Sequence, residues 1–166
     1  MEIAWGKKVS AAFKDRVVGI ASRLGCDPSH LMAAMAFESG ETFSPSIRNP
    51  SGATGLIQFM PTTATMLNTN TDALAGMTAE GQLTFVESYF KPWKGKLASL
   101  SDVYMAILWP KAVGQPDSFV LFAAPSQAYE QNKSLDANDD GEVTKGEAVA
   151  KVQQKLTLGL SPDRRG

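Results

Sequence analysis

The 166-residue sequence has one cysteine, Cys26, and one histidine, His30. A single cysteine cannot form an intramolecular disulfide, so the fold must be stabilised by packing alone, which suits folding in a reducing cytoplasm. No segment approaches the roughly 18 apolar residues of a membrane helix, so we expect no membrane insertion. Residues 1–8 lack the apolar core of a secretory signal. This predicts synthesis in a cytoplasm without export by the general secretory route.

The sequence also has no large excess of positive or negative charge, because its formal net charge is -1. Proteins that bind nucleic acids normally carry a clustered basic face, so no nucleic-acid partner is expected. Apolar residues make up 43% of the chain and charged residues 20%, as is typical of a globular protein. The length suits one core, so we expect a single domain over residues 1–166, and a monomer.

The apolar spacing indicates a mainly α protein. It predicts helices over residues 9–24, 28–39, 61–67, 78–90, 101–109 and 144–156. Ser101 is the expected cap of the fifth helix. Residues 41–54 are rich in Ser, Pro, Asn, Gly and Thr, which predicts a loop or a small irregular sheet.

Glu38 is the first candidate for a functional residue. Leu31, Met35 and Glu38 fall at helical spacing, so the carboxyl shares a face with apolar side chains. It also lies near the C-terminus of its helix, where the macrodipole disfavours negative charge. Both effects raise a carboxyl pKa, as a general acid requires near neutral pH. The alternative is a helix-end glutamate that reaches solvent or pairs with Arg48.

Two segments carry a family resemblance. Ala36-Phe37-Glu38-Ser39-Gly40 is followed by Asn49-Pro50-Ser51-Gly52-Ala53-Thr54-Gly55-Leu56-Ile57-Gln58-Phe59-Met60-Pro61-Thr62-Thr63-Ala64. These two segments resemble the lytic transglycosylases and goose-type lysozymes, whose hallmark is Glu-Ser, then Gly-Leu-Met-Gln-x-Met-Pro-x-Thr-Ala. Here Ile57 stands for the first Met of that motif. The resemblance implies a lysozyme-like, mainly α domain with a small irregular or β-hairpin element near its cleft.

The resemblance also implies residue roles. Glu38 would protonate the glycosidic oxygen between N-acetylmuramic acid and N-acetylglucosamine. Ser39 follows it in the motif and is a candidate substrate contact. Gln58 and Met60 would line the subsite at the scissile bond, and Asn49 stands where many relatives have a serine that contacts the reacting sugar.

Aromatic residues supply further candidates. Many relatives carry Ala-Tyr-Asn on a later helix, and Tyr104 is the best candidate for that tyrosine, although the asparagine is missing. The alternative for Tyr104 is a core aromatic. Tyr89, Phe90, Trp93 and Trp109 could stack on sugar rings, but large aromatics at helical spacing also suit a core.

The distribution of acids favours one catalytic carboxylate. Ordinary glycosidases use two, yet no acid lies between Thr42 and Thr71, and Glu41 is expected to point elsewhere. Asp72 and Asp102 remain candidates for a second catalytic carboxylate beside Glu38. In the transglycosylase scheme Glu38 acts as acid and then as base on the C6 hydroxyl of muramic acid, which gives a 1,6-anhydro product without a cofactor. Hydrolysis by the same glutamate, as in a lysozyme, is the alternative.

Residues 136–147 match the twelve-residue EF-hand pattern. A structural calcium ion is the candidate ligand. The oxygen ligands would come from Asp136, Asn138, Asp140, the Glu142 carbonyl and Glu147. The alternative is turn chemistry followed by a capping box from Thr144 to Glu147.

The expected function is cleavage of bacterial peptidoglycan in the periplasm or cell wall. The chain resembles the small bacteriophage members most, so an endolysin or virion-borne lysin is expected, with an effector delivered by a secretion apparatus as an alternative. A glycan-binding module with a dead site, and a calcium-sensing or structural virion component, are the rivals from other classes.

Overall fold

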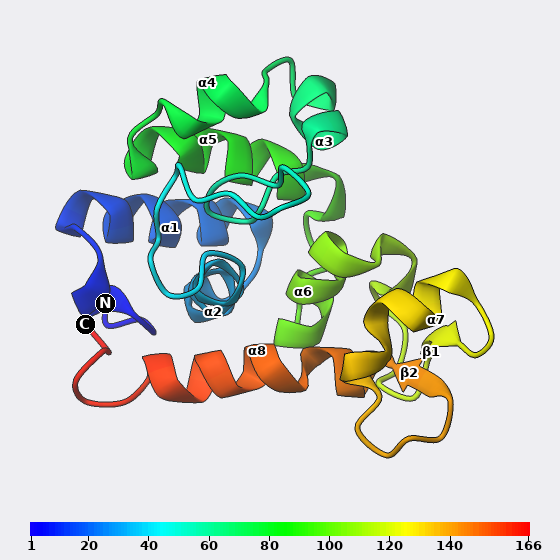
Figure 1. Cartoon of the computed structure of the whole chain (residues 1–166). Coiled ribbons are helices and arrows are strands. Elements are labelled where there is room, and N and C mark those ends of the chain that lie inside the picture. The colour runs from blue at the N-terminus through cyan, green and yellow to red at the C-terminus, as the bar shows by residue number, and fades with distance from the viewer.

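The computed structural model describes residues 1–166 and confirms the mainly α class (Figure 1). Its α-helices are α1 (Ala11–Leu24), α2 (Pro28–Glu38), α3 (Pro61–Met66), α4 (Thr71–Ala75), α5 (Ala79–Phe90), α6 (Leu100–Leu108), α7 (Gln127–Asn132) and α8 (Lys145–Gly159). The 3-10 turns are η1 (Gly6–Lys8), η2 (Lys91–Trp93), η3 (Pro110–Ala112) and η4 (Lys133–Leu135), and the strands are β1 (Val120–Ala123) and β2 (Glu142–Thr144). None of the helices combines the length and the apolar character that crossing a bilayer requires.

The centre of the molecule is α2, which packs against α1, α6 and α8 (Figure 1). Residues 31–36 of this helix are all buried, with at most 2% of each residue exposed. A helix that is apolar all round belongs inside a protein rather than on its surface. The two chain ends lie together beside it, since the Ile3 N–H donates to the Gly166 carbonyl at 2.8 Å.

Capping residues explain most helix boundaries. The Asp27 side chain accepts from the Ser29 N–H and Pro28 occupies the first turn of α2, as expected. Gly25 ends α1 in the left-handed region. The predicted cap of α6 was wrong by two residues, because the Ser99 hydroxyl, and not that of Ser101, accepts from the Asp102 N–H.

The loop between α2 and α3 is irregular and forms only isolated bridges, Arg48 with Thr54 and Thr54 with Phe59. The antiparallel pair β1–β2 lies elsewhere, beside residues 136–147. The small element near the predicted cleft is therefore a bridged loop rather than a hairpin.

A buried glutamine on α5 holds this loop in place. The Gln82 side chain accepts from the Leu56 N–H at 2.8 Å and donates to the Pro45 and Leu74 carbonyls at 2.9 Å each. Gly55 packs directly on it with φ 84°, and a Cβ there would lie 2.2 Å from the glutamine oxygen. The glycine is therefore required by both conformation and space.

A buried ion pair joins α6 to the start of α8. Lys145, 2% exposed, donates to Asp102 at 2.7 Å and also to the Ala112 and Gln115 carbonyls. Burial alone would raise the Asp102 pKa, but hydrogen bonds from Lys145, Gly114 and the hydroxyl of Ser99 hold that pKa below its usual range. Asp102 therefore stabilises the fold at neutral pH, and this contribution is lost as the pH falls through its lowered pKa.

We predict that Lys145→Met lowers the free energy of unfolding by about 3 kcal/mol, because it leaves Asp102 buried without its cation. Chemical denaturation at pH 7 measures this. The exposed Lys133, which pairs with Glu130 on the surface, provides the control, and Lys133→Met should change stability by less than about 1 kcal/mol. Equal effects from the two variants would contradict the role given to Lys145. The Lys145→Met defect should shrink in strong acid as Asp102 becomes protonated.

Candidate active site

Glu38 is the last residue of α2, at the mouth of the apolar core. Glu38 is only partly exposed, and its carboxyl forms no hydrogen bond or ion pair. Neither oxygen of this carboxyl is fully buried, so both remain accessible to solvent. Burial raises the Glu38 pKa to about 7. At neutral pH the group is thus divided between an acid that can donate a proton and a base that can accept one.

The other candidate charges near this site are engaged elsewhere. Arg48 pairs with Asp72 at 2.6 Å, so the alternative of an Arg48–Glu38 pair is wrong. Glu41 pairs with Lys155 on α8, in agreement with the expectation that it points away from the site. Asp102 is held by Lys145. Burial is the cause of the raised Glu38 pKa, and the Glu38 carboxyl has no ion pair that would lower it.

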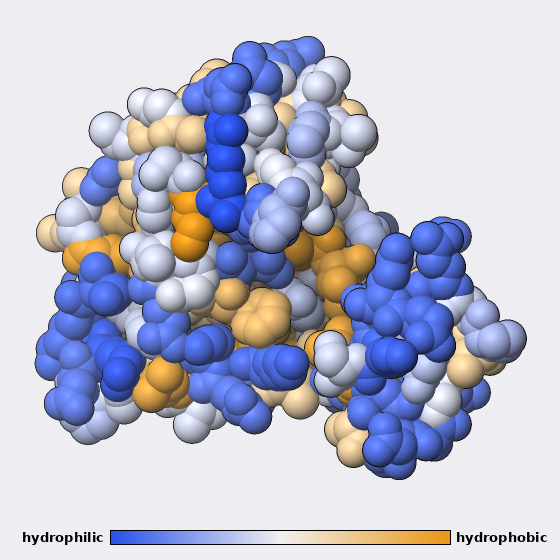
Figure 2. Space-filling model, viewed as in Figure 1, coloured by the Kyte–Doolittle hydropathy of each residue, from blue (hydrophilic) through white to orange (hydrophobic).

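The motif loop and the helices α3, α5 and α6 line a pocket of about 60 Å³. Its lining includes Ile57, Gln58 and Met60 from the loop, Tyr89 from α5 and Ile107 from α6. Figure 2 shows apolar side chains exposed in the notch between the part containing α3–α5 and the part containing α7, β1 and β2. Gln58 and Met60 are therefore brought together at one pocket, as the motif predicts.

The Gln58 side chain is fixed within its loop. Its backbone is left-handed, with φ 55°. Its amide Nε2 donates to the Ile47 carbonyl at 3.2 Å and to the Gly55 carbonyl at 3.1 Å. The amide oxygen has no partner in the protein and is accessible. The side chain thus presents an oriented acceptor to a ligand.

Two tyrosines lie within electrostatic reach of Glu38. Burial, and secondarily the charge of Glu38, raise the Tyr89 pKa to about 12 and raise that of Tyr104 further. Tyr104 is 5% exposed and packs edge-on against Phe37, with ring centroids 5.5 Å apart, and it does not line the pocket of Gln58. Tyr89 does line that pocket. The sequence indicated Tyr89 only as one of several aromatics, so its place beside the site is new.

Two predicted substrate contacts form hydrogen bonds to the backbone of their own loop. Ser39 is fully buried and its hydroxyl accepts from the Phe43 N–H at 3.0 Å, so it cannot reach a glycan. Its function is to turn the chain after α2. The Asn49 side-chain oxygen accepts from the Ser51 and Ala53 N–H groups, which leaves only its amide nitrogen for a sugar. Sugar contact by Asn49 stays a prediction.

The acidic loop lies beside β1 and β2, apart from α2, the helix that ends at Glu38 (Figure 1). Its capping box is confirmed, because the Glu147 carboxylate accepts from the Thr144 N–H while the Thr144 hydroxyl accepts from the Glu147 N–H. The Asp136 carboxylate accepts from the Gly141 N–H and from the Tyr129 hydroxyl. No three acidic side chains of the chain are grouped as metal ligands. Calcium binding by the predicted ligands stays a prediction. The ligands in question are Asp136, Asn138, Asp140, Glu142 and Glu147.

We predict that Glu38→Gln makes the protein more stable at pH 8, by on the order of 2 kcal/mol. The raised pKa means that the folded state resists ionisation, so wild-type stability falls as the pH rises from the ordinary value of 4.5 through about 7. Melting temperatures from pH 4 to 9 measure this. The difference between variant and wild type should vanish near pH 4. Glu130→Gln, on the surface, should give no comparable pH-dependent difference. A difference between Glu38→Gln and wild type that does not change with pH would refute the burial of the Glu38 charge.

Comparison with known proteins agrees with this geometry. Residues 18–94 match the family model described as the transglycosylase SLT domain. The matched segment begins in α1 and ends just after η2, so it contains Glu38, the loop with Gln58 and Met60, and Tyr89. No curated protein matches the chain. The segment that matches carries Glu38 and most of the lining of the pocket of Gln58, and residues 18–94 of the chain are therefore identified as a transglycosylase SLT domain of the lysozyme-like, lytic transglycosylase kind, which degrades peptidoglycan.

Proposed function

We propose that the protein cleaves the β-1,4 bond between N-acetylmuramic acid and N-acetylglucosamine with Glu38 as its only catalytic carboxylate, and leaves 1,6-anhydro ends. The observation that carries the proposal is the state of Glu38. It is largely buried, has no partner, reaches solvent and has a pKa of about 7. The neighbouring acids Glu41, Asp72 and Asp102 each have a cation of their own.

The reaction needs only this group and the substrate. Protonated Glu38 donates its proton to the glycosidic oxygen, and the bond between that oxygen and C1 of the muramic acid breaks. Positive charge develops at C1, where the neighbouring N-acetyl group can stabilise it. The Glu38 carboxylate then accepts the proton of the C6 hydroxyl as its oxygen bonds to C1. Glu38 is protonated again, and no water is consumed.

The pocket supplies orientation for this reaction. The accessible Gln58 oxygen can accept from an N–H or hydroxyl of the sugar, and Met60, 43% exposed, offers an apolar contact beside it. The Tyr104 hydroxyl has no partner in the protein and is not sealed from solvent. We assign it a contact to the substrate near Glu38, while Tyr89 lines the pocket of Gln58.

Hydrolysis by the same glutamate is the second candidate. An inverting hydrolase places a second carboxylate where it can activate water. The candidate acids Glu41, Asp72 and Asp102 are each paired with a cation, which favours attack by the sugar hydroxyl over activation of water.

The biological setting is proposed from the resemblance alone. The sequence around Glu38 resembles small bacteriophage enzymes. We therefore propose that the protein degrades the bacterial cell wall for a phage, either from the cytoplasmic side as an endolysin or from the virion. Its place of action is then the peptidoglycan layer. Delivery as a secreted effector would use the same chemistry.

Glu38→Gln should abolish release of muropeptides from purified peptidoglycan, because the amide cannot donate or accept the proton. Mass spectrometry of the wild-type products should show fragments one water lighter than reducing-end muropeptides. Glu41→Gln, a matched carboxyl three residues away, should retain activity. Reducing ends alone would refute the transglycosylase step but leave Glu38 as the acid. Substantial release by Glu38→Gln would refute the catalytic assignment.

We also propose a structural calcium ion in the 136–147 loop. The five predicted ligand residues stand at EF-hand spacing, and calcium prefers such oxygen donors. The ion would hold the loop between α7 and α8 and so support the β1–β2 pair. Its distance from Glu38 gives it no part in the chemistry.

Millimolar calcium should therefore raise the melting temperature of the wild type, by mass action on the folded state. Asp136→Asn should remove the calcium response, and magnesium at the same concentration provides the control for ionic strength. A melting temperature that does not respond to calcium would show that the loop is a turn leading into a capping box.

A further inference from the structure

We propose that a hollow between α1 and α5 binds a polyol phosphate chain, a polymer in which small polyols are joined by phosphodiesters. The hollow measures about 310 Å³, at the lower end of the range for small-ligand sites. It shares no lining residue with the pocket of Gln58. The anion site does not depend on the proposed function, and only the choice of a cell-wall polymer as its ligand rests on that function.

Positive charge is in excess in this hollow. Arg23 from α1 and the two lysines Lys91 and Lys94 line it together with a single acid, Glu87. Lys91 and Lys94 are exposed and form no ion pair. A hydrogen bond from Arg23 holds the Glu87 pKa below its usual range, so this acid stays ionised and offsets one of the three cations. The remaining surplus of positive charge favours an anionic ligand.

The free donors favour a phosphate over a carboxylate. A guanidinium group matches a carboxylate through two parallel hydrogen bonds. Arg23 already forms such a pair, because its Nε and Nη2 atoms lie 2.6 Å and 2.9 Å from the two Glu87 carboxylate oxygens. The donors left for a ligand are the ammonium groups of Lys91 and Lys94 and the hydroxyl of Ser88. Lysine binds phosphate as a point charge, and a tetrahedral phosphate accepts from several directions at once.

The rest of the lining indicates that the phosphate belongs to a polyol chain. No aromatic ring lines the hollow, so a nucleobase would have no surface on which to stack. Leu24 is the single apolar residue of the lining, and none of the exposed large apolar side chains of the protein lies there. The surface thus lacks the apolar contacts that membrane binding requires. The hydroxyls of Thr84 and Ser88 suit the oxygen atoms of a polyol.

The two lysines are carried on a fixed turn. Pro92 lies in the first turn of η2 and restricts the backbone between them. The Lys94 N–H donates to the Lys91 carbonyl at 3.1 Å, and the Gly95 N–H donates to the carbonyl of Leu24, the last residue of α1, at 2.9 Å. The backbone that positions both ammonium groups is therefore ordered before a ligand arrives, which lowers the entropic cost of binding.

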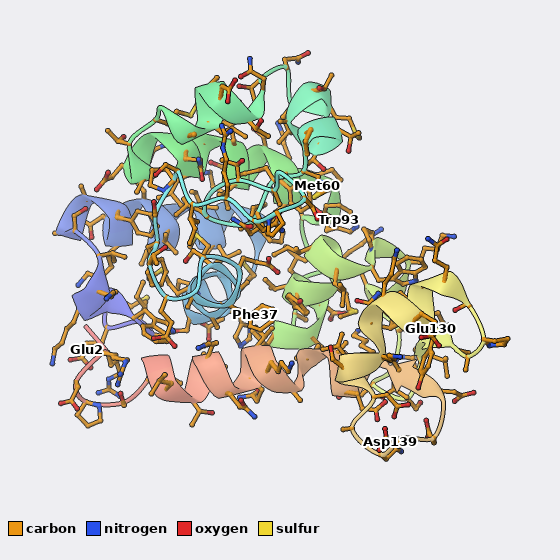
Figure 3. The ribbon with its side chains drawn as sticks, viewed as in Figure 1. Glu2, Phe37, Met60, Trp93, Glu130 and Asp139 are labelled. Atoms are coloured by element: carbon orange, nitrogen blue, oxygen red, sulfur yellow. The ribbon has the colours of Figure 1, made fainter.

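Both lysines lie near the catalytic pocket but outside it. They flank Trp93 in the sequence, and Figure 3 shows Met60 and Trp93 close together, where the motif loop meets the end of α5. Neither lysine lines the pocket of Gln58. A polymer bound in the hollow therefore holds the protein on the wall and leaves the pocket free for the glycan.

Calorimetric titration of a synthetic glycerol phosphate hexamer at low salt tests the site, because salt screens exposed charges. The double variant Lys91→Met/Lys94→Met should raise the Kd roughly tenfold. Both side chains are exposed, so the fold tolerates the changes. Lys133→Met/Lys151→Met removes the same charge from exposed positions elsewhere and should leave the Kd unchanged. Ser88→Ala keeps the charge and should raise the Kd roughly threefold, because it removes one hydroxyl donor.

Unchanged affinity in Lys91→Met/Lys94→Met would overturn the site, and so would an equal loss in the two double variants. Phosphatidylglycerol vesicles, single-stranded DNA and a glutamate hexamer separate the other sources of negative charge. Tighter binding of any of these three probes than of the glycerol phosphate hexamer, with the same dependence on Lys91 and Lys94, would overturn the choice of a polyol phosphate.

Digestion of cell walls separates this proposal from the proposed reaction. The wild type should release muropeptides faster than Lys91→Met/Lys94→Met from walls that carry polyol phosphate, and at the same rate from peptidoglycan stripped of the polymer. Equal rates on both substrates would overturn the wall polymer as the ligand. Lysine-dependent binding of the hexamer by a wild type that releases no muropeptides would refute the proposed reaction and keep the anion site.

Discussion

The unpaired carboxyl of Glu38 at the end of an apolar helix is the constraint on which the rest of the structure depends. Residues 31–36 are buried on every side, so the helix brings its last residue to the edge of the core without any cation of its own. A carboxylate in such surroundings is unfavourable unless it is paired, and it keeps its proton to about pH 7 instead. Ion pairs nearby complete this isolation, because Arg48 and Lys155 are bound to other acids.

The second half of the site is positioned by interactions that contribute nothing to its chemistry. Gln82 is buried in α5 and satisfies backbone groups on both sides of the motif loop. Gly55 lets that loop pack directly on the glutamine, so Gln58 and Met60 are presented from a fixed backbone. A catalytic group and its substrate contacts must be held to within a fraction of an ångström, and loops achieve this only when a rigid element supports them.

Local patterns predicted the helices and the two motif segments, because caps, glycines and apolar spacing act over a few residues. Gly25 and Asp27-Pro28 mark the ends of α1 and α2 in this way. The same patterns could not separate Ser39, which is buried, from a substrate contact, because the Glu-Ser pair looks the same whichever way the hydroxyl turns. Tyr89 and Phe90 are neighbours of similar type on α5, and only the packing of α5 against other elements puts one in the pocket and the other in the core.

The distribution of charge leaves the surroundings of Glu38 neutral. The acids of residues 136–147 lie at one end of the molecule, and the cations Arg23, Lys91 and Lys94 lie around a separate hollow between α1 and α5. An acid near Glu38 would raise its pKa further, and a cation would lower it and remove the proton that the reaction needs. The pocket lined by Gln58 and Tyr89 contains no charged side chain, so it leaves the protonated Glu38 undisturbed, as the proposed reaction requires.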